Sequence, residues 1–278
     1  MSQEKNKKRI EPFLKWAGGK SQLLKQFETL LPKADSYKRY IEPFIGGGAV
    51  FFYLEPHEAI IADLNKDLIN AYKILKNHAK ELIKTLEYYQ HNHSKDFFLK
   101  IRDEYNADKL DNINKAAHLI YLNKACFNGL YRVNKKGEFN VPFGQHKKFM
   151  VNQESLLATS RLLKHTQIEN IDFKKVLEYA KKGDFIYFDP PYYPLTTGSD
   201  FTSYNKEGFL EKEQETLADI FEQLDRRGCL LMLSNSDTKF IRNLYKKWNI
   251  TRVSAKRFIN CIAEKRGNVN EVVIRNYK

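Results

Sequence analysis

The chain has 278 residues, long enough to bury a sizeable core and to divide into two lobes. Lysine and arginine outnumber aspartate and glutamate by 47 to 34, and the resulting formal charge of +13 favours a polyanionic partner such as nucleic acid. No apolar run approaches the length of a membrane span, and we expect no secretory signal. The cysteines stand far apart without a CxxC pair, which disfavours metal and disulfide frameworks and favours a reducing compartment: Cys126, Cys229 and Cys261.

A glycine turn comes early in the chain. Residues 15–21 read Lys-Trp-Ala-Gly-Gly-Lys-Ser. The phosphate-binding pattern GxxxxGK fails here, because Leu14 stands where its first glycine is required. Two interpretations fit the residues: a flexible turn before a helix at 21–31 with Trp16 and Lys20 directed at a ligand, or an ordinary helix N-cap beside a packed Trp16.

A second glycine turn follows the first expected strand. Tyr40-Ile41 reads as the end of that strand, and Glu-Pro-Phe-Ile-Gly-Gly-Gly follows over 42–48. Residues 59–63, Ala-Ile-Ile-Ala-Asp, read as a second strand that ends in an acid. Such glycines let the backbone approach a ligand closely, and Asp63 can accept hydrogen bonds from two ribose hydroxyls. The spacing from Gly46 to Asp63 is close to the ~20 residues expected for a nucleoside site, although glycines also serve plain tight turns.

The middle of the chain is predicted to be mostly helical. Apolar side chains recur every three or four positions from Leu68 to Tyr89, which predicts an amphipathic helix. Helical and polar character continues to about residue 165, including helices at 115–127 and 155–164. Residues 127–144 depart from helical spacing, because alternating aromatics and valines flank a polar turn, and this predicts a β-hairpin.

Positive charge gathers in this middle region. Between residues 115 and 150 the basic side chains are opposed by Glu138 alone: Lys115, Lys124, Arg132, Lys135, Lys136, Lys147 and Lys148. This clustering fits neutralisation of phosphates. A solvated lysine-rich face, with a hairpin that packs its aromatics on the lobe, is the alternative.

Strand patterns return in the last third and alternate with helices. The strand-like runs are 167–172, 184–189, 229–234, 250–258 and 271–276, and helices are expected at 211–226 and 238–248. This alternation predicts an α/β sheet covered on both faces, with an inserted, mostly helical lobe. We expect a mobile tail over 1–9, a sheet domain over 10–67 and 166–278, and an inserted target-recognition domain over 68–165.

The most informative motif ends one of these strands. Asp-Pro-Pro-Tyr at 189–192 directly follows the apolar run 185–188. Prolines lack an N–H and have a fixed φ, so their carbonyls can point into a pocket, and Tyr192 offers a ring on which a base could stack. This arrangement suits a planar ring with an amino group, while the alternative is an ordinary loop. Ser-Asn-Ser at 234–236 ends another strand and either lines the same pocket or caps the next helix.

Several segments, in this order along the chain, carry a family resemblance: Lys15-Trp16-Ala17-Gly18-Gly19-Lys20, Phe44-Ile45-Gly46-Gly47-Gly48, Asp63, Phe127-Asn128-Gly129-Leu130-Tyr131-Arg132 and Asp189-Pro190-Pro191-Tyr192. Over roughly residues 10–278 the chain resembles the Dam-like DNA adenine methyltransferases. The resemblance implies a Rossmann-like mixed sheet of the S-adenosylmethionine-dependent methyltransferase type. It also implies methylation of the exocyclic amine of an adenine flipped out of GATC.

Partners and location follow from the same resemblance. It implies S-adenosylmethionine as methyl donor, no metal, and double-stranded DNA as partner, with no membrane association. The enzyme would be cytoplasmic and nucleoid-associated, of bacterial or phage type. It would act either beside a cognate restriction endonuclease, without direct contact, or in replication and repair.

The resemblance also assigns site residues. The methyl donor would contact Trp16, Lys20, Gly46, Gly48, Asp63, Asp172 and Asp189. The DNA-reading positions fall on Lys15, Phe127, Asn128, Leu130, Arg132 and Pro142. Phe127 departs from the family, where tyrosine is frequent. Stacking or wedging should survive this change, but a hydroxyl contact would not.

The predicted catalytic residues are Asp189, Pro190 and Tyr192. An adenine amine is a poor nucleophile because its lone pair is delocalised into the ring. The Asp189 carboxylate and the Pro190 carbonyl would accept its two hydrogens and free the lone pair, while Tyr192 stacks on the extruded base. Two alternatives stay open: an amino-methyltransferase acting on cytosine in DNA or on ribosomal RNA, and a non-catalytic DNA-binding module with a nucleoside pocket.

Overall fold

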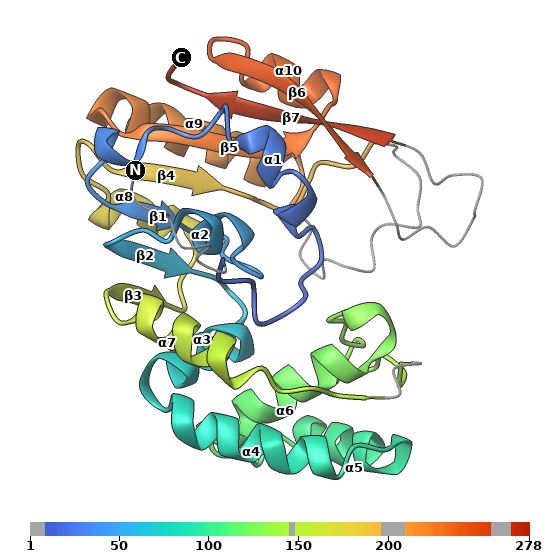
Figure 1. Ribbon diagram of the computed structural model, residues 1–278. Helices are drawn as coiled ribbons and strands as arrows, with labels where there is room; N and C mark the ends of the chain where they lie inside the picture. Colours follow the sequence, from blue (N-terminus) through green and yellow to red (C-terminus); the bar gives the residue numbers. More distant parts are fainter. Residues whose placement is uncertain (1–8, 145–147, 196–208, 257–267) are drawn as a thin grey trace. The chain divides into compact units, whose positions relative to one another are not determined.

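The computed structural model describes residues 9–144, 148–195, 209–256 and 268–278 (Figure 1). The chain forms two compact units. The helical unit spans Met1–Gly19, Gly46–His57 and Asn65–Ile168, and the sheet unit spans Lys20–Ile45, Glu58–Leu64 and Glu169–Lys278. Some of the positions discussed above lie outside the described residues: residues 1–8 of the tail, Lys147 and Cys261. The functional assignment of 10–67 with 166–278, and of 68–165, stays a prediction.

Within the described residues, seven strands form one mixed sheet in the order β3-β2-β1-β4-β5-β7-β6. The strands are β1 Tyr40–Glu42, β2 Ala59–Ala62, β3 Thr166–Glu169, β4 Phe185–Phe188, β5 Leu230–Ser236, β6 Asn249–Lys256 and β7 Asn268–Arg275. β2, β1, β4 and β5 are parallel neighbours, whereas β7 runs antiparallel to both β5 and β6. The predicted fold class, a Rossmann-like mixed α/β sheet, is therefore confirmed.

Apolar side chains on both faces bury the central strands of the sheet unit. All four residues of β4, Phe-Ile-Tyr-Phe, are fully buried. Helices α8 (Val176–Tyr179) and α9 (Glu211–Arg227) contribute Val176, Leu217 and Phe221 to a core that also holds Ile186 and Leu231. α9 begins where the Glu213 carboxylate accepts a hydrogen bond from the Leu210 N–H and ends at Gly228, whose φ is 84°.

The remaining helices of the sheet unit are short: η1 Lys20–Gln22, α1 Leu24–Phe27, η2 Ala34–Ser36, η4 Phe173–Lys175 and α10 Lys239–Leu244. The helix predicted at 21–31 is thus two short pieces, and the one predicted at 238–248 is the shorter α10. The strand predicted at 250–258 is β6, and residues 257 and 258 lie outside the described part of the chain.

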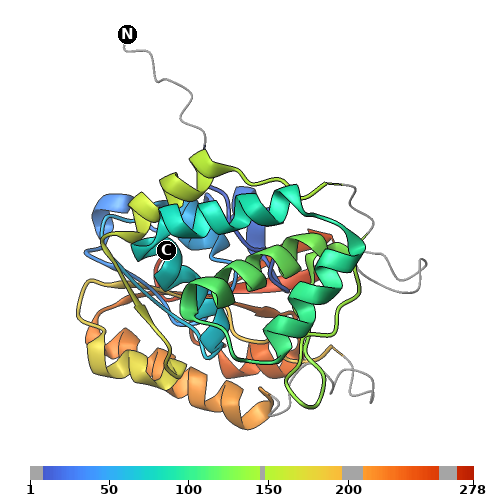
Figure 2. The same ribbon diagram turned by 90° about the horizontal axis from the view of Figure 1, so that it is seen from below.

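The helical unit contains α2 Ala49–Leu54, α3 Lys66–Asn77, α4 Ala79–His91, α5 Lys95–Asn106, α6 Asn112–Ala125, η3 Phe127–Gly129 and α7 Gln153–Leu163. α6 is buried on nearly every side and contacts α3, α4 and α5 (Figure 2). Its sequence is apolar around most of its circumference, as expected for a central helix.

The single helix predicted over 68–89 is two helices in the structure. α3 and α4 are separated at His78, where φ is −131° and ψ is 38°. No glycine or proline marks this break, and the apolar period runs on through it. Both helices pack against α6, and the bend at His78 lets each bury its own apolar face there.

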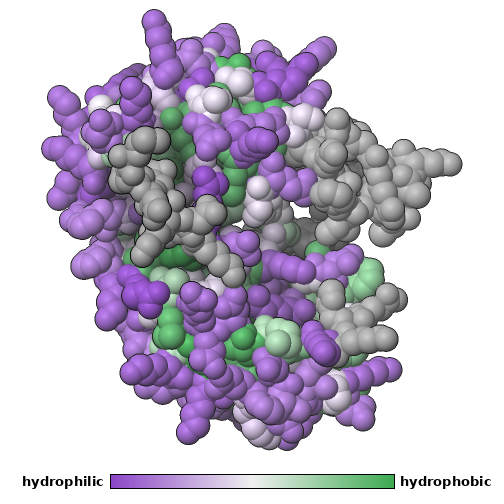
Figure 3. All heavy atoms as spheres, in the orientation of Figure 1, coloured by the Kyte–Doolittle hydropathy of each residue, from purple (hydrophilic) through white to green (hydrophobic). Residues whose placement is uncertain are grey.

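The surface is mostly polar, and hydrophilic residues predominate on the face drawn in Figure 3. A few large apolar side chains are nevertheless exposed on the helical unit, among them Phe127 at 46% and Met150 at 65%. Phe127 is one of the predicted DNA-reading residues, and its exposure leaves the ring accessible to a partner.

Candidate functional site

Two acids follow the parallel strands β2 and β4 of the sheet unit, which are separated in the sheet by β1. Ala59 in β2 and Phe185 in β4 both pair with Tyr40 in β1, so these three residues lie side by side in the sheet. Asp63 comes four residues after Ala59, and Asp189 comes four residues after Phe185. Two strand spacings of about 4.8 Å separate β2 from β4, so the two Cα atoms lie on the order of 10 Å apart at the carboxyl edge. Asp63 and Asp189 therefore share the edge where open α/β sheets bind ligands.

Asp189 is paired with a buried lysine. The Nζ of Lys20 lies 2.8 Å from Oδ1 of Asp189, and the two side chains are 6% and 20% exposed. Desolvation of the carboxylate raises the pKa of Asp189 from 3.8 to about 6; the positive charge of Lys20 opposes this rise and the negative charge of Glu271 adds to it. Asp189 is thus a carboxylate close to its titration point in the neutral range.

Tyr192 is held beside this pair. The Lys20 Nζ lies 4.8 Å from the centre of the Tyr192 ring, and the Tyr192 hydroxyl donates a hydrogen bond of 2.7 Å to Oε2 of Glu271. A cation over the ring and an anchored hydroxyl leave the ring little rotational freedom. The aromatic face is thereby fixed close to Asp189.

Two oxygen acceptors remain available in the Asp-Pro-Pro-Tyr loop. Among the described residues, no group donates a hydrogen bond to the other Asp189 oxygen, Oδ2, or to the Pro190 carbonyl. The next carbonyl differs, because Pro191 O accepts 3.0 Å from Nε2 of Gln214. The loop therefore offers two neighbouring acceptors to an outside donor such as an amino group.

Buried amides support the same loop. Asn235 Nδ2 donates to Oε1 of Gln214 at 3.0 Å, and Asn235 Oδ1 accepts from the N–H groups of Tyr193 and Ser236 at 3.1 and 2.8 Å. The Ser236 hydroxyl donates to the Tyr193 carbonyl at 2.7 Å. The helix-cap interpretation of 234–236 is wrong, because Thr238 caps α10; these residues hold the loop that follows β4.

Asp63 and Asp172 both lie in the sheet unit, with different roles. The Asp63 carbonyl accepts a hydrogen bond of 2.8 Å from Nδ2 of Asn170, and its N–H donates to Glu169 O at 3.3 Å. These contacts fix the backbone of Asp63 to the end of β3. The Asp172 carboxylate accepts from the Lys174 N–H at 2.9 Å and caps η4, so part of its hydrogen-bonding capacity is used within the protein.

The second glycine turn packs against Trp16 in the helical unit. Gly46 and Gly48 have φ values of 46° and 72°, which favour glycine. A Cβ at Gly46 would lie 3.0 Å from Cδ1 of Trp16, and one at Gly48 would lie 2.7 Å from the Tyr72 hydroxyl. The Tyr72 hydroxyl donates to Gly46 O at 3.1 Å. These glycines are thus required by the packing of the turn itself.

The predicted DNA-reading residues all lie in the helical unit. Asn123, fully buried near the end of α6, accepts from the Lys15 N–H at 2.9 Å and donates to Lys15 O at 2.8 Å and Gly129 O at 3.1 Å. It thereby brings Lys15 to Phe127–Leu130. The Phe127 N–H donates to Pro142 O at 2.9 Å.

The predicted hairpin is a compact loop. Residues 126–144 contain two isolated bridges, Cys126 with Phe143 and Val133 with Phe139, and a turn in which the Gly137 N–H donates to Asn134 O at 2.9 Å. Arg132 donates from Nε to Oδ1 of Asn140 at 2.8 Å and from Nη2 to the Asn140 carbonyl at 3.2 Å. The exposed guanidinium is therefore oriented by the opposite arm of the loop.

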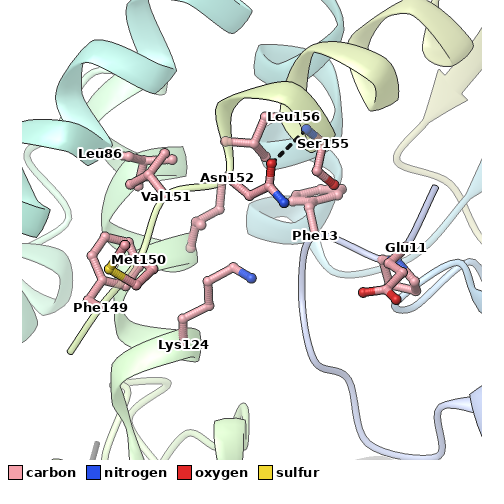
Figure 4. Close-up of a pocket in the computed structure, with 12 residues that line it drawn as sticks. Glu11, Phe13, Leu86, Lys124, Phe149, Met150, Val151, Asn152, Ser155 and Leu156 are labelled. Carbon is pink, nitrogen blue, oxygen red and sulfur yellow. Dashed lines mark hydrogen bonds between the residues drawn. The ribbon is translucent and has the colours of Figure 1, made fainter. Parts of the chain in front are cut away.

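A cavity of about 160 Å³ also opens in the helical unit (Figure 4). Glu11, Phe13, Lys124, Met150 and Asn152 are among its lining residues. Burial and the charge of Lys15 lower the pKa of Lys124, while Glu11 raises it. None of the predicted site residues lines this cavity.

The described residues hold neither a metal-binding cluster nor a membrane-spanning helix. Among residues 9–144, 148–195, 209–256 and 268–278, no group of three or more His, Cys, Asp or Glu side chains is arranged to hold a metal ion. Within the same ranges no helix combines the length and apolar character that crossing a membrane requires.

Comparison with known proteins gives a consistent result. Residues 16–259 match the model of the family described as D12 class N6 adenine-specific DNA methyltransferase. The type II methyltransferase M.MjaIII of Methanocaldococcus jannaschii is 46% identical, covering 96% of this chain and 99% of the relative. The type II methyltransferase M1.LlaDCHI of Lactococcus lactis subsp. cremoris is 42% identical, covering 99% and 98%. The DNA adenine methylase of Escherichia coli K12 is 32% identical, covering 96% and 95%.

Proposed function

The chain belongs to the D12 class N6 adenine-specific DNA methyltransferases, and from this premise we propose that it transfers a methyl group from S-adenosylmethionine to an adenine flipped out of GATC in duplex DNA. The observation that carries the proposal is the pair of available acceptors at the end of β4, Asp189 Oδ2 and the Pro190 carbonyl, beside the anchored ring of Tyr192.

The amino group of adenine needs help to become a nucleophile. Its lone pair is delocalised into the ring while the nitrogen is planar. Hydrogen bonds from its two hydrogens to Asp189 and Pro190 favour a tetrahedral nitrogen and stabilise the positive charge that develops there. Tyr192 holds the base by stacking, which offsets part of the few kcal/mol that unstacking costs. These residues orient the adenine and accept hydrogen bonds from its amino group, and no covalent bond to the protein is needed.

S-adenosylmethionine supplies an electrophilic methyl group on a sulfonium. We assign Trp16, Gly46 and Gly48 in the helical unit, and Lys20, Asp63, Asp172 and Asp189 in the sheet unit, to binding this donor. The sheet-edge position of Asp63 supports the assignment. Asp63 would accept hydrogen bonds from the ribose hydroxyls.

DNA would be read by the loop at 126–144 together with Lys15. The N–H groups of Arg132 that do not bond Asn140 would donate to the major-groove edge of a guanine. Phe127 and Leu130 act as wedges, and Asn128 and Pro142 complete the set. The specificity for GATC rests on the resemblance of these positions to the Dam-like enzymes.

The biological setting that we propose is a restriction-modification system. Two relatives with 46% and 42% identity are named type II methyltransferases, against 32% for the E. coli DNA adenine methylase. Methylation would protect host DNA from an endonuclease that recognises the same sequence.

The catalytic proposal is tested with Asp189→Ala. Loss of one acceptor should reduce single-turnover methylation by about 10²–10³-fold, because single hydrogen-bonding groups aimed at developing charge contribute on that order. DNA binding, measured by fluorescence anisotropy, should stay within about twofold since Asp189 makes no phosphate contact in this scheme. Asp219→Asn on the exposed side of α9 is the control. Full activity of Asp189→Ala would remove the mechanism.

The substrate and the sequence are tested together. Labelled methyl incorporation into duplex DNA and into ribosomal RNA should differ strongly in favour of DNA. Sequencing of modified bases across a genome-scale DNA sample should place N6-methyladenine in GATC. Modification of cytosine, or of adenine in another sequence, would refute the corresponding part of the proposal. Arg132→Ala should lower discrimination against near-cognate sites by about 1–3 kcal/mol.

A further inference from the structure

Trp16 contacts two parts of the helical unit that have different proposed roles. The glycine turn packs on it so closely that a Cβ at Gly46 would lie 3.0 Å from its Cδ1 and one at Gly47 would lie 3.2 Å from its Cβ. The same indole stacks on Tyr131, with ring centroids 4.8 Å apart and planes inclined by 19°. Tyr131 directly precedes Arg132. One ring therefore joins the proposed donor turn to the proposed DNA-reading loop.

Tyr131 also contacts residues on both sides of the loop. Its hydroxyl interacts with Asn65, the N-cap of α3, and with Tyr105. Tyr105 in turn donates a hydrogen bond of 2.6 Å to Oδ2 of Asp67. The Tyr131 ring also lies 6.1 Å from the ring of Phe139 on the other arm of the loop. A displacement of Tyr131 would thus disturb contacts on both arms of the 126–144 loop.

A second attachment lies next to the stack. Asn123 bonds both the N–H and the carbonyl of Lys15 and also the carbonyl of Gly129. Gly129 has a φ of 66°, and a Cβ there would lie 3.0 Å from Cβ of Lys15. Residues 15 and 16 are therefore held against the loop by hydrogen bonds and by ring stacking.

We infer that Tyr131 is a positioning residue that couples binding of the methyl donor to reading of DNA, by way of its stack on Trp16. The inference rests on the proposed function, because it assigns the donor to the glycine turn and DNA to the loop. A donor that fixes Trp16 also fixes Tyr131, and Arg132 follows in sequence. DNA then binds to a loop that has already lost part of its freedom.

The coupling has a definite thermodynamic signature. If the donor tightens DNA binding by some factor, DNA must tighten donor binding by the same factor. A single aromatic contact supports a factor of roughly five, at the low end of couplings between sites. Removing the stack should bring this factor towards one while each ligand still binds alone.

The experiment measures both sides of this relation. The Kd of a duplex carrying GATC is measured with and without saturating S-adenosylhomocysteine, the demethylated donor product, and the Kd of S-adenosylhomocysteine is measured with and without the duplex. The wild type should show the same factor of roughly five in both. Tyr131→Phe, which keeps the ring, should retain it, and Tyr131→Leu should lose it. Tyr88→Leu, an exposed tyrosine on α4, is the matched control and should retain the factor.

The outcomes separate the inference from the proposed function. If S-adenosylhomocysteine does not bind the wild type at all, the proposed function fails. If both ligands bind the wild type but independently, or if Tyr131→Leu keeps the wild-type factor, the coupling inference fails while the proposed function stands. Should Tyr131→Leu not fold, as judged by its thermal transition, Tyr131→Met replaces it under the same criteria.

A fluorescence measurement reports on the stack directly. Trp248→Phe leaves Trp16 as the remaining tryptophan. The emission of Trp16 should change on donor binding when Tyr131 is present, and its change on adding duplex should shrink in the Tyr131→Leu or Tyr131→Met variant.

Discussion

Lys20 and Glu271 act on the acidity of Asp189 in opposite directions. Desolvation raises its pKa to about 6, Lys20 lowers it and Glu271 raises it. Methyl transfer needs the ionised carboxylate, so kcat/KM should fall as the pH drops below about 6. Lys20→Met should move this acid limb to higher pH, and Glu271→Gln should move it to lower pH. The profiles are measured at saturating donor from about pH 5 to about pH 9.

Protonation of Asp189 should have opposite effects on stability and on activity. Because the folded protein raises the pKa of Asp189 above its unfolded value of 3.8, the protonated form favours folding. This contribution is complete below the unfolded pKa and is lost as the pH rises through about 6. Denaturant titrations of the wild type and Asp189→Ala should therefore diverge in this window.

For the pH dependence of kcat/KM, Lys20→Met and Glu271→Gln should shift the acid limb in opposite directions. Shifts in the same direction would contradict the electrostatic account.

Gly48 and Gly137 separate backbone strain from steric contact. Both have positive φ, 72° and 85°. A Cβ at Gly137 meets nothing within 4 Å, whereas one at Gly48 meets the Tyr72 hydroxyl at 2.7 Å. Gly137→Ala should lower the free energy of unfolding by about 1–2 kcal/mol, and Gly48→Ala should add about 1–3 kcal/mol of overpacking to this. Urea unfolding measures both, and equal losses would show that the space around Gly48 can relax.

At the scale of single residues, sequence patterns identify a side chain with a chemical role more readily than they identify the residues that it contacts. Asp189 could be predicted because a carboxylate and two prolines follow an apolar strand. Its pairing with Lys20 could not, since 169 positions separate them and only the folded chain brings them together. Asn123 did leave a signal, a polar side chain inside the apolar helix α6, and a buried amide needs partners. Gln214 has a similar signal in α9.

Among the elements, the loop after β4 depends on α9 and β5. Gln214 and Asn235 are fully buried and connect Pro191 O to the backbone of Tyr193. Gln214→Met should leave these groups unpaired, displace the Pro190 carbonyl and lower kcat by roughly 10–100-fold, because small misplacements of reacting groups are costly. The KM for the donor should change little.

The control for this prediction lies on the same helix. Gln223→Met is an exposed substitution of the same type on α9 and should leave kcat unchanged. Removing a buried amide also costs stability, about 1–3 kcal/mol. A variant Gln214→Met that unfolds more easily but keeps wild-type kcat would show that the amides support folding and do not position the loop.

Element types were predictable where a hydrophobic period persists. The strands β4, β5 and β7 and the helices α7 and α9 follow from such periods. The break at His78 was not predictable, because it depends on how α3 and α4 each pack on α6. Strand order was also outside the reach of periodicity, since pairing of β7 with both β5 and β6 is a tertiary outcome.

For the whole molecule, the charge of +13 predicts a steep dependence of DNA affinity on salt. The turn at 134–137 carries two exposed lysines, Lys135 and Lys136. Replacing both by alanine should reduce the slope of log Kobs against log salt by up to about 1.8, since each released counterion contributes about 0.9. Base discrimination should be unaffected.

The matched control removes the same charge elsewhere. Lys80 and Lys84 are exposed on α4. Their double alanine variant should keep the wild-type slope, measured by anisotropy over a range of salt concentrations. An equal decrease in both double variants would mean that net charge, and not the turn, sets the salt dependence. Composition alone predicted the acidic partner but could not identify which lysines face it.

The place of β7 affects how the protein is made. β7 comes after β6 in the chain yet lies between β5 and β6 in the sheet. While the ribosome is still translating residues 268–275, β6 lacks its partner strand in the described sheet and β5 presents an open edge. The nascent polypeptide must therefore delay closing this part of the sheet, which bears Glu271, the partner of Tyr192. We expect the catalytic constellation to assemble late in biosynthesis, after a period in which a chaperone could bind the bare strand edge.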